Sequence, residues 1–263
     1  MSEHYAELQM YVAPQQVQQA NELWLTRIFE RLGVNRRNAE HLDLRSLWRA
    51  PELLLSQTCG YPLMTELRGR VQLIGRPRYE LLHSSAGEHC SLLLTRDDNP
   101  RTTLADFYGS RGVINGQDSN SGMNLLRERL APMQRDGRFF ASVAVSGAHR
   151  ESLRWLREDR ADLAAIDSVT FDYLARFAPH EVAGLRIVTR SAASPSLPYI
   201  TALGLSEEQV VQIRQTMNLA LQDLPHVVQT LGVQEVLPAH EADYEVLLDY
   251  RRRAEALGFP KVE

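Results

Sequence analysis

Residues 111–130 read RGVINGQDSNSGMNLLRERL and join a short apolar strand to a helix through a polar loop. We expect the strand over 111–115 and the helix over 123–130, with the loop 118–122 between them. Two further junctions of the same kind follow, at Ser146-Gly147 and at Asp167-Ser168. Successive strand-to-helix junctions build parallel sheets whose loops gather at the carboxyl ends of the strands. The stretch therefore predicts an α/β fold.

The rest of the chain continues this alternation. A strand is expected over 8–12, and Pro14 then opens a helix that ends at Gly33. The expected core face of that helix is Val17, Ala20, Trp24, Ile28 and Leu32. Further strands are expected over 53–55, 70–75, 91–95 and 185–189. Ser206 and Gln209 form a capping box for a later helix with core positions Val210, Ile213, Met217, Ala220 and Leu224.

Composition narrows the possible functions. The chain has 263 residues, 44% of them hydrophobic and 24% charged, which is typical of a soluble globular protein. Lys261 is the only lysine among the 29 Lys and Arg residues, which excludes a P-loop and argues against pyridoxal-phosphate chemistry. The net charge of −4 lacks the basic footprint of a nucleic-acid-binding protein. We expect no cofactor and no nucleic-acid partner.

Cysteine usage and the N-terminal sequence bear on metal binding and location. Cys59 and Cys90 form no CxxC motif, so no metal site is expected, and a disulfide between them is possible but not indicated. No apolar run is long enough to insert into a membrane, and no signal-peptide pattern is present. The sequence as it stands predicts a cytoplasmic protein, or a periplasmic one if a signal segment has been trimmed from it.

Several polar side chains stand at the predicted strand ends. In the loop 118–122, Ser119, Asn120, Ser121 and Gly122 could hold a small oxyanion on helix amides and hydroxyls, although one serine could simply cap the helix. Ser146 and His149 follow at the next junction. Asp167 could accept a hydrogen bond from a ligand or cap the helix that begins at Ser168. Tyr11, Gln57, Thr58 and Tyr61 fall at other strand ends, where packing is an equal interpretation.

Four segments in order resemble the phosphate/phosphonate-type substrate-binding proteins of ABC transporters. They are Gln57-Thr58-Cys59-Gly60-Tyr61-Pro62-Leu63, residues 118–126 (DSNSGMNLL), residues 146–153 (SGAHRESL) and residues 161–167 (ADLAAID). The resemblance runs from Met10-Tyr11 to Leu257-Gly258-Phe259-Pro260. Each motif is short, but the order and the intervals are specific.

The resemblance implies a two-lobed type 2 periplasmic-binding-protein fold, with mixed, mostly parallel sheets and a ligand cleft between the lobes. Lobe one is expected to comprise residues 1–88 and 190–263, and lobe two residues 89–189. By this resemblance, Ser119, Ser121, Gly122 and His149 grip the oxyanion, and Tyr61 closes on it from lobe one. Asp167 is the position that can receive a ligand amine. The chain departs from the family pattern at Asn120, where the family has a second serine or threonine.

These observations predict a non-catalytic protein that binds a small anionic or zwitterionic ligand, such as phosphate or a phosphonate. Its expected protein partner is an ABC permease or a sensor. One alternative is an enzyme of cofactor or small-metabolite biosynthesis that uses His149 and Asp167 as acid and base. Another is a partner-binding module that has lost its ligand.

Overall fold

The computed structural model describes residues 3–11 and 14–263, and the chain divides into two units. Unit 1 comprises the residues up to Glu88 together with Pro195–Tyr244, and unit 2 comprises His89–Ser194 and Glu245–Glu263. Two short strands mark the first two crossings, β5 (Glu88–His89) and β11 (Ser194–Pro195), and they pair with each other. The first crossing lies between Glu88 and His89.

Unit 1 contains a six-stranded sheet in the order β13-β4-β12-β3-β1-β2. These strands are β13 (Val233–Leu237), β4 (Val71–Tyr79), β12 (Tyr199–Ala202), β3 (Leu53–Gln57), β1 (Glu3–Glu7) and β2 (Asn35–Arg37). Pairing is parallel among β3, β1 and β2, and antiparallel among β3, β12, β4 and β13. The predicted mixed sheet is confirmed, with more antiparallel pairing than expected, because the chain returns to this sheet after visiting unit 2.

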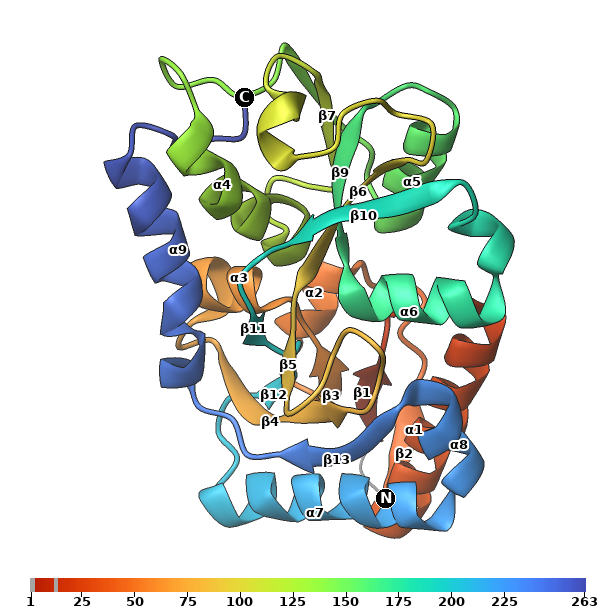
Figure 1. The fold of residues 1–263 in the computed structure, drawn as a ribbon. Helices are drawn as coiled ribbons and strands as arrows, with labels where there is room; N and C mark the ends of the chain where they lie inside the picture. The colour runs from red at the N-terminus through yellow and green to blue at the C-terminus, as the bar shows by residue number, and fades with distance from the viewer. Residues whose placement is uncertain (1–2, 12–13) are drawn as a thin grey trace. The chain divides into compact units, whose positions relative to one another are not determined.

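The helices of unit 1 are α1 (Gln15–Leu32), α2 (Leu44–Trp48), α3 (Gly60–Pro62), α7 (Glu207–Asp223) and α8 (Pro225–Leu231). A π-helical turn over Leu63–Leu67 and a 3-10 turn over Glu241–Tyr244 complete the unit. Helix α1 begins after Pro14 and ends at Gly33, which has φ 66° and closes the last turn in the left-handed conformation. Helices α7 and α8 pack against α1 (Figure 1).

The first strand is displaced from its predicted position. It was expected over 8–12, but β1 covers Glu3–Glu7, and Ala6 is the residue that pairs with Leu55 of β3. The apolar residue Leu8 suggested a strand that begins too late in the sequence, because Leu8 is buried although it lies after the end of β1. Tyr11 therefore lies four residues after β1, and Val12 lies outside the described residues.

Unit 2 contains a five-stranded sheet in the order β10-β6-β9-β7-β8. Its strands are β10 (Leu185–Arg190), β6 (Ser91–Arg96), β9 (Leu163–Asp167), β7 (Arg111–Ile114) and β8 (Ser142–Val145). Strand β7 pairs in parallel with β8 and β9, while β6 is antiparallel to β9 and β10. The parallel half is the part predicted from the successive junctions, and it brings the ends of β7, β8 and β9 to one edge.

The helices of unit 2 are α4 (Leu125–Leu130), α5 (His149–Arg157), α6 (Ser168–Phe177) and α9 (Glu245–Ala256). A π-helical turn over Asn120–Asn124 precedes α4, and 3-10 turns cover Leu104–Phe107, Ala131–Met133 and Pro179–Glu181. The apolar cluster Leu92, Leu94, Val113, Leu153 and Ile166 fills the space between this sheet and its helices.

The C-terminal segment belongs to unit 2, whereas the sequence placed all of 190–263 in lobe one. Helix α9 lies beside α4 (Figure 1). The Asn124 amide donates to the carbonyl of Leu247 at 3.0 Å, and Arg127 donates to the carbonyl of Pro260 at 2.8 Å. Buried Leu247, Tyr250 and Phe259 therefore cover unit 2, and a helical periodicity alone does not say which sheet a helix covers.

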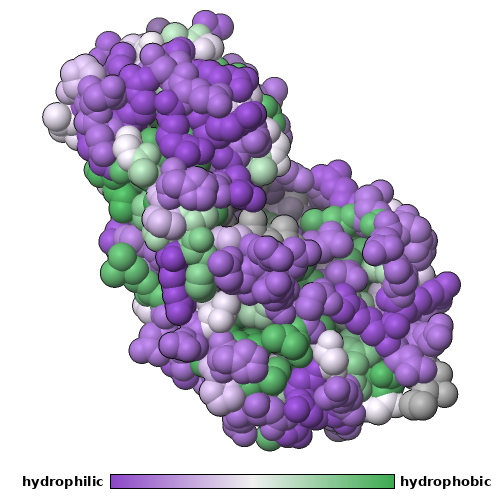
Figure 2. Space-filling model, turned by 90° about the vertical axis from the view of Figure 1, so that its right-hand side faces the viewer, coloured by the Kyte–Doolittle hydropathy of each residue, from purple (hydrophilic) through white to green (hydrophobic). Residues whose placement is uncertain are grey.

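The face drawn in Figure 2 is mostly hydrophilic, with hydrophobic residues in scattered groups. None of the helices in the described part of the chain is both long enough and apolar enough to cross a bilayer.

Candidate functional site

The first junction of unit 2 shapes the backbone around Gly122. Ser119 caps the π-helical turn, since its Oγ accepts a hydrogen bond from the Gly122 amide at 3.0 Å. A Cβ on residue 122 would lie 1.7 Å from Asn115 Oδ1 and 3.2 Å from His149 Cε1. A larger residue at 122 would force the Asn115 side chain to move, so Gly122 permits a close approach here, and Ser119 acts as the cap of the turn.

The second junction brings His149 to the first. The Oγ of Ser121 lies 3.0 Å from Nε2 of His149, the first residue of α5. Ser91 on β6 donates to the backbone carbonyl of Ser121 at 2.7 Å and so fixes this turn against the sheet. The structure thus unites two motifs that the sequence could place only at neighbouring strand ends.

Asp167 ends β9 and is nearly fully buried. Its Oδ1 accepts from the backbone amides of Val169 and Thr170 at 2.9 and 3.1 Å, so it caps α6. Ser91 is its cross-strand partner, which places this carboxylate close to the Ser121 turn. The side chain is therefore beside the predicted oxyanion site while also serving the helix.

Three polar residues at the site, Ser91 described above and also His89 and Ser194, were not predicted from the sequence. His89 lies with Nε2 3.3 Å from Asp167 Oδ2 and Nδ1 3.4 Å from Ser194 Oγ. Ser194 in turn accepts from the Asn120 amide at 3.0 Å. We call the group His89, Ser91, Asn120, Ser121, His149, Asp167 and Ser194 the polar cluster.

The remaining candidate of unit 2, Ser146, closes the turn between β8 and α5. Its Oγ lies 2.7 Å from Ser152 Oγ and donates to the carbonyl of Ala148 at 3.0 Å. These contacts hold the chain that carries His149. A direct contact from Ser146 to a ligand stays a prediction.

Four candidates lie on unit 1. Tyr11 is buried with its ring edge-on to Tyr79 at 6.4 Å, and the Gln57 amide donates to the carbonyl of Leu197 at 3.0 Å. Thr58 Oγ1 donates to the carbonyl of Cys59 at 3.2 Å, and Tyr61 is buried in α3. Their contacts within unit 1 account for their burial, and their role toward a ligand stays a prediction.

The polar cluster contains a serine, a histidine and an aspartate, as a hydrolytic triad does, but their arrangement is different. A serine beside a histidine could act as nucleophile and base if a carboxylate oriented the imidazole. Here the oxygens of Asp167 face the amides of α6 and the ring of His89, so Asp167 acts on His149 through its charge. Hydroxyl, imidazole and amide groups arranged in this way suit the binding of an oxyanion.

Within residues 3–11 and 14–263, no group of three His, Cys, Asp or Glu side chains is placed to hold a metal ion. Cys59 and Cys90 are both buried and are not joined by a disulfide. Burial raises the pKa of the Cys90 thiol, which keeps it protonated at neutral pH.

His149 makes the stability of the protein depend on pH. Burial lowers the pKa of His149 below its ordinary value of 6.5, and the charge of Asp167 only partly opposes this shift. The unfolded chain therefore binds the proton more readily, so acidification from pH 7 to 5 favours unfolding by at most about 1.4 kcal/mol per pH unit for this group. Urea unfolding of the wild type and of His149→Asn at pH 7 and pH 5 measures this change in the free energy of unfolding. If both proteins lose the same stability on acidification, His149 is not its cause.

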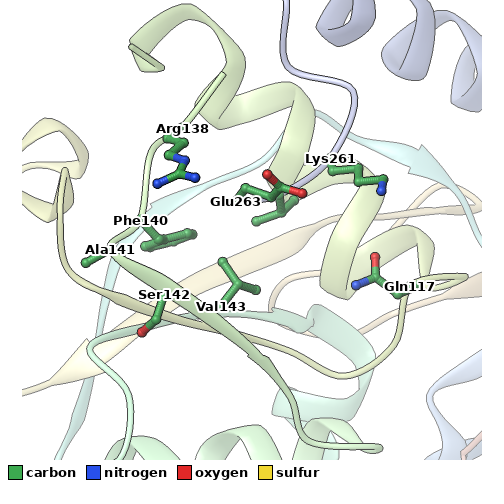
Figure 3. Close-up of a pocket in the computed structure, with 9 residues that line it drawn as sticks. Gln117, Arg138, Phe140, Ala141, Ser142, Val143, Lys261 and Glu263 are labelled. Carbon is green, nitrogen blue, oxygen red and sulfur yellow. The ribbon is translucent and has the colours of Figure 1, made fainter. Parts of the chain in front are cut away.

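A hollow of about 690 Å³ on unit 2 is lined by none of the predicted site residues (Figure 3). Arg138, Phe140, Ser142, Lys261 and Glu263 are among the residues that line it. The amides of Phe139 and Phe140 donate to the carbonyl oxygen of Glu263, which holds the last residues of the chain against the start of β8. Lys261, the single lysine, thus lies on unit 2.

Comparison with known families identifies the class of protein. The sequence model of the family described as ABC transporter, phosphonate, periplasmic substrate-binding protein matches residues 52–244. The match covers most of the chain and includes each junction of the polar cluster. The molecule is a solute-binding protein, not an enzyme. More particularly, the chain belongs to the family of periplasmic substrate-binding proteins of phosphonate ABC transporters.

Solved structures show the same fold at low sequence identity. A binding protein component of an ABC phosphonate transporter from Pseudomonas aeruginosa aligns with a TM-score of 0.80 at 16% identity, over 97% of this chain and 88% of the other. PhnD1 from Prochlorococcus marinus, in complex with methylphosphonate, aligns with a TM-score of 0.75 at 11% identity, over 96% and 98%. No curated protein matches the sequence.

Family membership confirms the predicted class, fold and non-catalytic role. A protein of this family binds a small solute and delivers it to an ABC permease, and the family is periplasmic. The enzyme alternative and the partner-module alternative are therefore set aside.

Proposed function

We propose that the solute is a small oxyanion, phosphate or a phosphonate, and that the polar cluster of unit 2 holds it. The observation that carries the proposal is the pairing of Ser121 with His149 beside the crowded backbone of Gly122. A hydroxyl, an imidazole and the amides of a helix start can surround a tetrahedral anion with donors. The methylphosphonate bound by PhnD1 of Prochlorococcus marinus supports this chemistry.

The amide of Asn120, which stands where the family pattern has a hydroxyl, makes hydrogen bonds within the protein, and its contact with the anion stays a prediction. Its Nδ2 donates to Ser194, and its Oδ1 accepts from Asn124 at 3.1 Å. Asn120 therefore supports the turn, and Ser121 and His149 are the side chains of this loop pair that we assign to the anion.

Calorimetric titration with inorganic phosphate, methylphosphonate and sulfate tests the proposal. We expect phosphate or methylphosphonate to bind, and Ser121→Ala to weaken that binding about tenfold to hundredfold, because a hydrogen bond to a charged group contributes about 1.5–3 kcal/mol. Ser142→Ala, an exposed serine on β8 of the same unit, is the matched control and should bind as the wild type. The proposal is wrong if a folded wild type binds none of the three anions.

A further inference from the structure

The loop that carries Ser121 is hydrogen-bonded to the chain beside the first crossing. The chain enters unit 2 at His89, and Ser91 follows two residues later. The Ser91 hydroxyl donates to the backbone carbonyl of Ser121 at 2.7 Å. The Ser91 amide donates to Ser191 Oγ at 2.8 Å, and the Ser191 amide donates to the Ser91 carbonyl at 2.9 Å. Ser91 therefore joins the loop to the chain that has just entered unit 2.

Asn120 connects the same loop to the other two crossings. Its Nδ2 donates at 3.0 Å to Oγ of Ser194, the last residue of unit 2 before the second crossing. Its Oδ1 accepts from the Asn124 amide at 3.1 Å, and Asn124 also donates to the carbonyl of Leu247 at 3.0 Å. Leu247 lies in α9, which begins directly after the third crossing. Residues 120–124 thus reach the chain beside each of the three crossings.

These hydrogen bonds lie in the interior of unit 2. Ser91, Asn120, Asn124 and Ser194 are all buried. A buried amide or hydroxyl that loses its partner pays the full cost of desolvation, so the groups of such a network stay paired or move together. A change in the loop is therefore felt by the chain at the crossings.

We propose that residues 120–124 form a relay that transmits oxyanion binding to the three crossings, with Asn120 as its positioning residue. The inference rests on the proposed function and concerns what the bound anion does to the protein. An anion that accepts from the Ser121 hydroxyl holds the loop in place. The carbonyl of Ser121 then keeps its hydrogen bond to Ser91, and the Asn120 side chain keeps its hydrogen bond to Ser194. The chain beside the crossings opens to solvent less often as a result.

The relay also gives a physical reason for the amide at position 120. Asn120 reaches Ser194 with its nitrogen and Asn124 with its oxygen. The serine or threonine of the family pattern is a shorter side chain with a single oxygen, which has to serve both partners. The departure from the pattern at Asn120 therefore strengthens the connection between the loop and the second crossing.

Amide hydrogen exchange with and without saturating methylphosphonate tests the relay. We expect the ligand to slow exchange about threefold to tenfold at the amides of Ser91 and Ser191 and over residues 192–194, because one neutral hydrogen bond contributes a factor of about this size. If the wild type binds methylphosphonate and these amides exchange as fast as before, the inference is overturned and the proposed function stands.

Variants separate the branches of the relay. Ser194→Ala removes the acceptor of Asn120, so we expect the ligand effect over 192–194 to disappear while the effect at Ser91 remains. Asn120→Ser is too short to reach both partners and should show the same loss. Ser142→Ala, an exposed serine on β8, is the matched control and should keep the effect in both places. Saturating ligand in every sample removes differences in affinity from the comparison.

Each further outcome decides the matter. If folded Ser194→Ala keeps the ligand effect over 192–194, the relay does not act through Asn120 and the inference is overturned. If that variant does not fold, the wild type and Asn120→Ser decide. Exchange that slows equally throughout unit 2 reports general stabilisation by the ligand and also overturns the inference. If the folded wild type binds neither methylphosphonate nor inorganic phosphate, the proposed function fails and the inference fails with it.

Discussion

Replacement of Trp24 by alanine is expected to lower the free energy of unfolding of unit 1 by about 3–5 kcal/mol. Trp24 is 0% exposed, and its ring lies edge-on to Tyr199 of β12 with centroids 5.6 Å apart. Its Nε1 donates to the carbonyl of Met217 at 3.1 Å, which ties α1 to α7. The alanine removes the largest side chain between these helices and leaves a cavity together with an unpaired carbonyl. Urea unfolding followed by circular dichroism measures the loss.

Two control variants divide this effect into its parts. Trp24→Phe keeps most of the ring but loses the N–H donor, and we expect a loss of about 1–3 kcal/mol from the unpaired Met217 carbonyl and the smaller ring. Leu23→Ala changes the neighbouring side chain of the same helix, which is 48% exposed, and should alter stability by less than about 0.5 kcal/mol. An unfolding midpoint of Trp24→Ala equal to that of Leu23→Ala would refute this account of the core.

Helix α1 could be predicted in detail from its sequence. The apolar spacing from Val17 to Ile28 recurs every three or four residues, and the structure buries these positions. Leu32, the last position of the pattern, is only partly buried, because Gly33 ends the helix there. Strand β1 was placed too late in the sequence, because Leu8 and Tyr11 are buried after the end of the strand, and the pairing of β1 with residues 35–37 and 53–57 is not visible in the local sequence.

The candidate site likewise contains some residues that the sequence could indicate and others that it could not. Ser119, Ser121, Gly122 and His149 could be predicted because strand-to-helix junctions are local patterns. His89 and Ser194 could not be placed beside Asp167 from the sequence, because their positions depend on the antiparallel pairing of β6 with β9. That pairing joins residues about 70 positions apart in the sequence, and such long-range pairing leaves no periodic signal.

The assignment of α9 shows a second limit of sequence analysis. The apolar face of α9 could be recognised from its helical periodicity, but the unit against which it packs could not. The contacts that fix it are made through main-chain carbonyls, since Asn124 donates to Leu247 and Arg127 to Pro260. A carbonyl that serves as an acceptor has no signature in the amino-acid sequence, so the tail could be assigned only from the structure.

Gly122→Ala is expected to weaken oxyanion binding by about a hundredfold, the larger of the two effects on function in this loop. The new Cβ would stand 1.7 Å from Asn115 Oδ1 and 2.7 Å from Asn115 Cγ, distances that no packed methyl group tolerates. The Asn115 side chain has to move, and His149 Cε1 at 3.2 Å limits the space on the other side. A shift of the turn separates Ser121 from His149, whose 3.0 Å contact defines the proposed anion site. Titration with methylphosphonate measures the loss.

A matched control and a rescue make this last prediction specific. Gly116→Ala lies between β7 and this loop, where the added Cβ meets only Asp118 Oδ1 at 3.0 Å, and we expect it to bind as the wild type. Combining Gly122→Ala with Asn115→Ala removes both of the closest atoms and should restore about tenfold of the affinity, leaving the milder contact with His149. If the double variant binds no better than Gly122→Ala, crowding by Asn115 is not the cause. If Gly122→Ala itself binds as tightly as the wild type, the Asn115 side chain moves aside without disturbing the turn, and the prediction is wrong.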